Sequence, residues 1–171
     1  DLAGEQALAP GTNLGADPIG SALRADAEPT LDGLVEVASL ARDRGVLGVV
    51  VDATAVHDLG ASDVQELAYA AAVGAAYLRA LVAAGLSVDE AAGLVEFRLA
   101  ATDEQFPTIA KLRASRRLWA RILEVSGAED DTMRLHAVTS RPMMTKYDPW
   151  VNMLRTTVAA FAAGVGGADS I

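Results

Sequence analysis

Residues able to do chemistry cluster around position 136, where Arg134, His136, Thr139 and Ser140 fall within one short segment. We place this segment at the carboxyl end of a predicted strand, the end at which barrel enzymes position their catalytic groups. There, His136 could donate a hydrogen bond to a substrate carbonyl, which makes it a candidate binding residue. A purely structural hydrogen bond is the alternative that the sequence leaves open.

A second candidate is the pair His57 and Asp58, which follows another predicted strand and could transfer protons. Neighbouring side chains in a loop rarely face one another, so we favour a role for both as polar residues at the start of a helix. The chain has two histidines and no cysteine, and therefore no convincing ligand set for zinc or iron. We expect no metal site, and no arrangement of Ser, His and Asp indicates a nucleophile.

One basic segment could bind phosphate or an acidic partner; its cations are Lys111, Arg113, Arg116, Arg117 and Arg121. An apolar stripe runs through the same segment at helical spacing, formed by Ile109, Leu112, Trp119 and Leu123. This pattern predicts a helix with one buried face and basic residues on its other faces, a solvated or interface helix rather than a nucleic-acid reader. The net charge of −9 also argues against nucleic acid and anionic membranes as partners.

Helices and strands that alternate along the chain must position these residues. Caps and stop signals predict helices over 31–44, 62–84 and 104–126, and a last helix from Pro149 to the glycines at 164–167. A short helical turn is expected after Ser87. Buried apolar runs predict strands over 46–52, 94–100 and 133–139. The first 29 residues indicate only a short strand near Leu8 followed by loop.

Such an alternation requires a parallel sheet with right-handed crossovers, either an open doubly wound sheet or a closed barrel. No glycine-rich phosphate fingerprint follows the first clear strand, which lowers the expectation of a dinucleotide-binding sheet. A complete (β/α)8 barrel needs about 250 residues, so a chain of 171 would be little more than half of one.

The chain is expected to be one domain over residues 1–171. Its longest apolar run, 67–78, stops at Arg79 and is too short to span a membrane, and the absence of cysteine suits a reducing cytoplasm. The chain opens at Asp1 without a Met and ends at Ile171 on what reads like the start of a strand. We therefore expect both ends to be cuts.

Three segments resemble the acyl-CoA mutase barrel in their order and spacing: the helix at 110–120, the run at 134–140 and the run Asp148–Thr156. Gly60, Ala61 and the helix after them also match. The chain therefore resembles the methylmalonyl-CoA mutase family from about the fourth strand of the barrel to the start of the eighth. The resemblance implies an α/β fold, a partial (β/α)8 TIM barrel.

In such enzymes the barrel axis admits the pantetheine arm of a CoA ester, a cobalamin domain caps the active end, and adenosylcobalamin starts a radical rearrangement between methylmalonyl-CoA and succinyl-CoA. By this resemblance Arg24, Arg134 and His136 match substrate-binding residues. Arg24 would pair with the substrate carboxylate.

Other positions depart from the catalytic pattern of the family. Thr54 and Ala55 stand where catalytic chains carry a Tyr-His pair, while Leu94, Glu96 and Arg98 replace an Arg, a Ser and a Phe. Val138 and Arg141 replace a Gln and a Gly, and Leu14 matches an earlier Gln. Each lost hydrogen bond to a buried acyl group would cost about 1 to 3 kcal/mol, so several together should abolish productive binding.

The sequence therefore predicts a small, non-catalytic subunit that stabilises a catalytic large subunit in a heterodimer. Acyl-CoA would bind at the partner's site, and adenosylcobalamin would serve the holoenzyme without being bound by this chain. The alternative is a catalytic acyl-CoA mutase with altered acyl specificity. An unrelated α/β domain with chance matches is a third interpretation, which four ordered motifs argue against.

Overall fold

Four parallel strands form one sheet in the order β1-β2-β3-β4. The computed structural model describes residues 8–9 and 11–171 of the chain. The strands are β1 (Asn13–Ala16), β2 (Leu47–Asp52), β3 (Val95–Ala101) and β4 (Arg134–Thr139). Each strand pairs with the one that follows it in the sequence, so strand order never reverses across the described sheet. Beyond β4, His136 forms a parallel bridge with Ser170.

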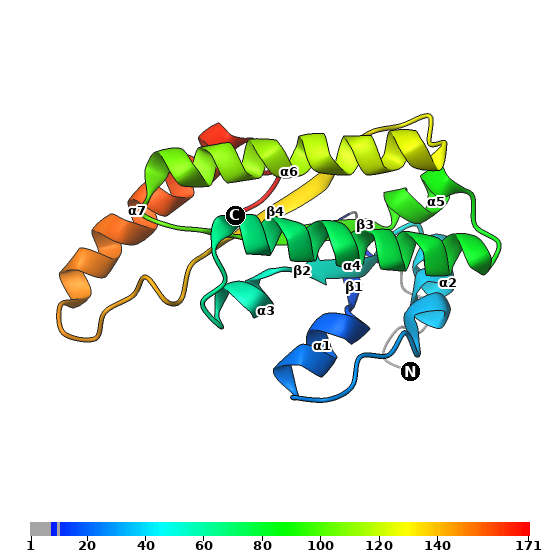
Figure 1. Ribbon diagram of the computed structural model, residues 1–171, viewed down its shortest axis with the longest axis horizontal. Coiled ribbons are helices and arrows are strands. Elements are labelled where there is room, and N and C mark those ends of the chain that lie inside the picture. The colour runs from blue at the N-terminus through cyan, green and yellow to red at the C-terminus, as the bar shows by residue number, and fades with distance from the viewer. Residues whose placement is uncertain (1–7, 10) are drawn as a thin grey trace.

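The helices are α1 (Pro18–Arg24), α2 (Leu34–Arg44), α3 (Thr54–His57), α4 (Asp63–Ala83), α5 (Val88–Gly93), α6 (Gln105–Ser126) and α7 (Pro149–Gly166). Figure 1 shows α4 and α6 side by side in front of the strands, and the two helices are in contact. The core between sheet and helices takes alternate strand residues: Val49, Val51, Phe97, Leu99, Leu135 and Ala137. Sequential strands with a helix layer on one face form an arc of a (β/α)8 barrel, which confirms the predicted fold class.

Because side chains alternate across a strand, the intervening residues point to the opposite face, called here the inner face. Its residues belong to two rows in register, Val50, Glu96 and Arg134 in one and Asp52, Arg98 and His136 in the next. In a closed barrel this face lines the axis. Five of these six side chains are polar or charged, unlike the aliphatic residues under the helices.

The N-terminal part differs from the prediction. Leu8 lies outside any strand, and the first strand is β1, in which Gly15 has a positive φ of 79°. The expected loop contains α1, capped by Asp17, which accepts a hydrogen bond from the Gly20 amide. Short, glycine-containing elements of this kind carry too little hydrophobic periodicity to be recognised in a sequence.

The predicted helix caps are confirmed with one exception. Capping boxes form at Ser62 and Ser87, Asp148 caps α7, and Gly45 ends α2 in the left-handed conformation. The exception is Thr30, whose hydroxyl accepts the Asp32 amide in a turn, so that α2 begins at Leu34 rather than 31. A threonine hydroxyl can form such a local turn as readily as a helix cap, which explains the three-residue error.

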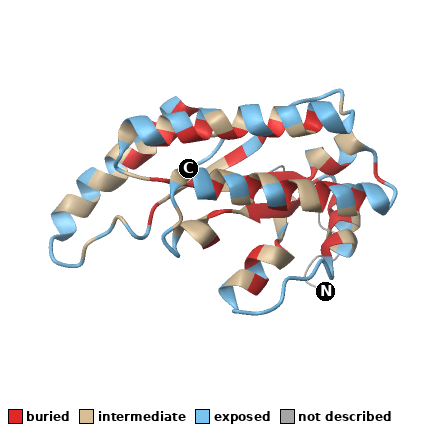
Figure 2. Cartoon of the chain, viewed as in Figure 1, coloured by how far each residue is buried: buried red, intermediate tan, exposed pale blue. Residues whose placement is uncertain are grey.

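The core packs helices closely against β3. The Phe97 and Trp119 rings meet edge to face with centroids 4.7 Å apart, and Gly74 of α4 lies directly over both. By length and composition α4 could cross a membrane, a test that core helices also pass. Figure 2 shows buried residues recurring along α4 and α6, where they face the sheet. We interpret α4 as a core helix.

Candidate functional site

His136 lies inside β4, within the strand that the sequence predicts over 133–139. It is the third residue of β4, in register with Arg98 on β3, which in turn is in register with Asp52 on β2. Its Nδ1 lies 2.9 Å from the Ser170 hydroxyl. The predicted strand over 133–139 is therefore confirmed as Arg134–Thr139, and His136 projects onto the inner face.

Arg24 reaches the same row from the last turn of α1. Its Nη2 lies 2.6 Å from Asp52 Oδ2, and its Nη1 lies 3.8 Å from Asp17 Oδ2. Arg24 thus contacts Asp52, which lies in the same register row as Arg98 and His136 on the two neighbouring strands. The guanidinium that resembles a carboxylate-binding residue is already paired with a carboxylate of this chain.

Arg134 occupies a different place. It begins β4, is exposed, and lies one row below His136, in register with Glu96. With Asp89, Gly93 and Leu47 it lines a depression at the amino ends of the strands. The structure therefore brings Arg24 and His136 to one row of the inner face and leaves Arg134 nearer the opposite end.

Glu96 and Arg98 form an ion pair on the inner face. Arg98 Nε lies 3.4 Å from Glu96 Oε1, and Glu96 is buried with 7% of its surface exposed. Successive inner-face positions of β3 thus carry two long side chains that hold each other. Any ligand threaded along this face would have to displace a partly desolvated ion pair.

Thr54 and Ala55, just after β2, offer no free polar side-chain group. Thr54 donates both its amide and its hydroxyl to Asp52 Oδ1, at 3.0 and 2.5 Å, and Ala55 is buried in α3. Both positions are therefore used to turn the chain from β2 into α3. Neither projects a group suited to polarise a carbonyl.

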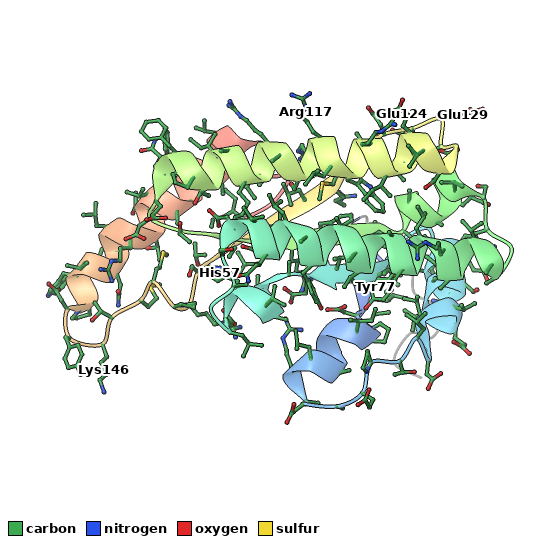
Figure 3. All side chains as sticks on the ribbon, viewed as in Figure 1. His57, Tyr77, Arg117, Glu124, Glu129 and Lys146 are labelled. Carbon is green, nitrogen blue, oxygen red and sulfur yellow. The ribbon has the colours of Figure 1, made fainter. Side chains whose placement is uncertain are left out.

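A buried polar network lies at the carboxyl ends of the strands, and the sequence interpretation missed it. His57 Nε2 lies 2.7 Å from the Ser140 hydroxyl, while Glu66 accepts the Ala100 amide at 2.6 Å and pairs with Lys111 at 2.7 Å. Figure 3 shows His57 beside the N-terminal end of α4, the helix that supplies Glu66. The network therefore joins α3, α4, α6, β3 and the segment after β4.

Its geometry superficially matches a Ser-His-acid nucleophile. Ser140, however, is only 3% exposed, and His57 Nδ1 lies 3.6 Å from Glu66 Oε2, beyond hydrogen-bond range. Both oxygens of Glu66 already have partners in Ala100 and Lys111. We interpret the network as a structural clamp that fixes the carboxyl edge of the sheet.

The basic segment of α6 is divided between two roles. Lys111 is buried, which corrects the prediction that all five cations occupy outer faces, whereas Arg117 points outward (Figure 3). Arg116 donates to the carbonyls of Gly167 and Met133 and pairs with Asp169 at 2.9 Å. A sequence signal for Lys111 exists, since Thr108, Lys111 and Ser115 are polar residues at helical spacing beside the apolar stripe.

A second buried polar cluster ties α1 to α4. Tyr77 donates to Asp17 Oδ1 at 2.7 Å and accepts the Ile19 amide at 2.9 Å. Burial raises the pKa of Asp17 above 3.8, although the Tyr77 hydrogen bond opposes that shift. Burial and the Asp17 contact raise the pKa of Tyr77, and burial raises the pKa of Tyr69 to about 12. Both tyrosines therefore stay neutral across the physiological range.

Residues 8–9 and 11–171 contain no group of three or more His, Asp or Glu side chains placed to hold a metal ion. Both imidazoles have hydroxyl partners, His57 with Ser140 and His136 with Ser170. One nitrogen of each ring is therefore engaged within the chain, and the other nitrogen of His57, Nδ1, is buried 3.6 Å from Glu66 Oε2.

The chain is similar to one protein family and to several proteins of known name. The family described as Methylmalonyl-CoA mutase matches residues 35–171. The chain is 52% identical over 161 residues to the "Probable methylmalonyl-CoA mutase small subunit" of Mycobacterium tuberculosis, covering 93% of this chain and 26% of that protein. It is 54% identical over 162 residues to the "Methylmalonyl-CoA mutase small subunit" of Streptomyces virginiae, covering 92% and 26%.

The protein of the same printed name from Propionibacterium freudenreichii subsp. shermanii is 47% identical over 165 residues, covering 93% of this chain and 26% of that protein. The chain thus spans about a quarter of the length of these relatives.

Proposed function

The chain belongs to the methylmalonyl-CoA mutase family, and on that premise we propose that it is part of a small, non-catalytic subunit of an adenosylcobalamin-dependent methylmalonyl-CoA mutase. The holoenzyme would interconvert methylmalonyl-CoA and succinyl-CoA in the cytoplasm, in propionate metabolism. This subunit would support a catalytic large subunit in a heterodimer. Acyl-CoA would bind at the partner's site.

The observation that carries the proposal is the Glu96 and Arg98 pair on the inner face. Both side chains are long and charged, and together they occupy neighbouring inner-face positions of β3, along which a thioester arm would run. If a ligand pushed Glu96 and Arg98 apart, a partly buried charge would lose its partner, and this would cost free energy. Side chains of this kind along the barrel axis favour the interpretation that the barrel interior is filled rather than open as a substrate tunnel.

The residues around this pair support the same conclusion. Thr54 is hydrogen-bonded to Asp52, and Ala55 has no polar group, so neither of these two positions supplies an electrophile or acid. Arg24 is paired with Asp52, and His136 with Ser170. The substrate-binding roles of Arg24, Arg134 and His136 therefore remain predictions, and the contacts of Arg24 and His136 argue for structural roles of these two residues.

The cofactor would supply radical chemistry to the holoenzyme when bound. The described residues of this chain do not form a site built for it: the His57 side chain is largely buried between Ser140 and Glu66, His136 Nδ1 lies beside the Ser170 hydroxyl, and the Thr54 hydroxyl is bonded to Asp52. We assign adenosylcobalamin to the large subunit.

The test is reconstitution of activity. The full-length polypeptide that contains this chain is assayed with adenosylcobalamin and methylmalonyl-CoA, alone and after mixing with the large subunit. We expect succinyl-CoA to form only when the large subunit is present. Turnover by the isolated polypeptide would instead support the alternative, a catalytic mutase with altered acyl specificity.

A further inference from the structure

Helix α7 carries a stripe of large apolar side chains that contact nothing over most of their surface. The stripe, called here the outer stripe, consists of Trp150, Met153, Leu154 and Phe161, with 77%, 62%, 65% and 59% of their surfaces exposed. None of the four is charged, and the helix that carries them extends well beyond the sheet in Figure 1. Isolated exposed apolar residues are ordinary, but a row of four at helical spacing is not.

The outer stripe lies directly opposite the buried face of α7. The residues of that face, Ala159, Ala162 and Ala163, are completely buried against α6 and the sheet. At 3.6 residues per turn, the four stripe residues fall within an arc of roughly 100° centred about 180° from these alanines. The stripe therefore points radially away from the sheet.

Completion of the barrel would not cover such a stripe. In a (β/α)8 barrel each helix packs inward on the sheet and sideways on its two neighbours. One flank of α7 already contacts α6, and the next helix of the ring would take the other flank. The outward face stays free in the closed ring, so its cover must come from outside the barrel.

Composition and size both suit a permanent protein interface. The four side chains expose on the order of 500 Å² of apolar surface, as much as the largest patch on a typical monomer. A standard interface takes about 800 Å² from each partner, so the stripe could form its core. At its edge, Arg155 pairs with Asp103 at 3.3 Å and donates to the Met143 carbonyl, so its charge is satisfied within the chain.

We propose that the outer stripe is the surface on which this chain binds the large subunit, with Trp150 and Phe161 as the main anchors. The inference rests on the proposed function, because the relatives named small subunits imply a larger partner. A surface that is apolar, aromatic and free of charge is typical of obligate assemblies rather than of transient ones. The partner surface should accordingly be an apolar pocket with a polar rim.

The test uses the full-length polypeptide and a purified large subunit from the same organism. Trp150→Glu and Phe161→Glu are made separately, and Val64→Glu is the matched control, because Val64 is an apolar residue with 75% of its surface exposed on a different helix, α4. We expect the Kd for the large subunit to rise at least about thirtyfold in both stripe variants. The control should change it by less than about threefold.

An unchanged Kd in both stripe variants would overturn the inference and leave the proposed function standing. Failure of the unaltered polypeptide to bind the large subunit would contradict the proposed function itself. Thermal melting of the free polypeptide tests whether the outer stripe is exposed before the large subunit binds. If it is, we expect the Tm of the stripe variants to stay within about 2 °C of the parent. A fall of about 5 °C or more would show that another segment of the same polypeptide covers the stripe, and would overturn the inference.

Discussion

Lys111 Nζ lies 2.7 Å from Glu66 Oε2 beneath the helix layer, where both side chains are almost wholly buried. Asp63 adds a second carboxylate 2.8 Å from the same ammonium group, and the Ala100 amide donates to the other oxygen of Glu66. Through these contacts α6 and α4 are tied to the carboxyl end of β3. The charges stabilise the fold only as a set, because a buried charge without its partner is costly.

Lys111→Met should therefore destabilise the full-length polypeptide by about 3 to 5 kcal/mol, measured by urea unfolding. Arg121→Met is the matched control on the same helix, because Arg121 is exposed and pairs only with exposed Glu124. Its effect should stay within about 0.5 kcal/mol. An equal loss of unfolding free energy in the two variants would contradict the interpretation that Lys111 is part of a structural clamp.

Tyr77→Phe should cost about 1 to 3 kcal/mol at neutral pH, because it removes one hydrogen bond from the buried Asp17 carboxylate and the tyrosine oxygen that accepts the Ile19 amide. The loss should shrink in acid, since the bond to a neutral carboxyl group is weaker than the bond to a carboxylate. Urea unfolding at pH 7 and near pH 4 measures both. The control is Tyr69→Phe, whose hydroxyl finds no hydrogen-bond partner among the described residues and whose removal should be neutral.

The raised pKa of Asp17 also predicts the sign of a pH effect. The folded chain holds the Asp17 proton more tightly than the unfolded chain, whose pKa is near 3.8. The contribution of Asp17 to stability is therefore greatest below that value and declines as pH rises through the folded pKa. Asp17→Asn should remove this decline from the curve of unfolding free energy against pH. If the slope of unfolding free energy against pH above pH 4 were the same in Asp17→Asn and the parent, the pKa of Asp17 would not be raised in the folded chain.

Gly74→Ala tests the packing of α4 on β3. A Cβ there would lie 2.9 Å from Phe97 Cζ and 3.0 Å from Trp119 Cζ3, so overpacking should cost about 1 to 3 kcal/mol. Gly164→Ala in α7 meets nothing within 4 Å and should stabilise by up to about 1 kcal/mol through helix propensity. Thermal melts of the two variants should therefore move in opposite directions. A stabilised Gly74→Ala variant would contradict the close approach.

Ser140 should resist reagents that label activated serines. It is buried, and the imidazole beside it is not hydrogen-bonded to Glu66. Incubation of the folded polypeptide with a fluorophosphonate, followed by peptide mass analysis, should leave Ser140 unmodified. Labelling that disappears in His57→Ala would show instead that the network activates a nucleophile.

The sequence was sufficient for the elements with strong local signals. The strand at 46–52 was predicted from a continuous apolar run, and the helix starts at Ser62 and Ser87 were predicted from capping boxes. Both signals lie in residues close together in the sequence. β1 and α1 were missed because four and seven residues carry little periodicity. The clamp was missed for a different reason: Lys111 meets Glu66, and Ser140 meets His57, only when helices and strands far apart in sequence pack together.

The central claim is that the inner face of this chain holds no acyl-CoA, because Glu96 and Arg98 occupy it. Isothermal titration of the assembled heterodimer with methylmalonyl-CoA tests the claim most directly, beside a titration of the full-length polypeptide alone. We predict one binding site per heterodimer and no saturable binding to the isolated polypeptide. Two sites per heterodimer, or saturable binding to this polypeptide alone, would contradict the account.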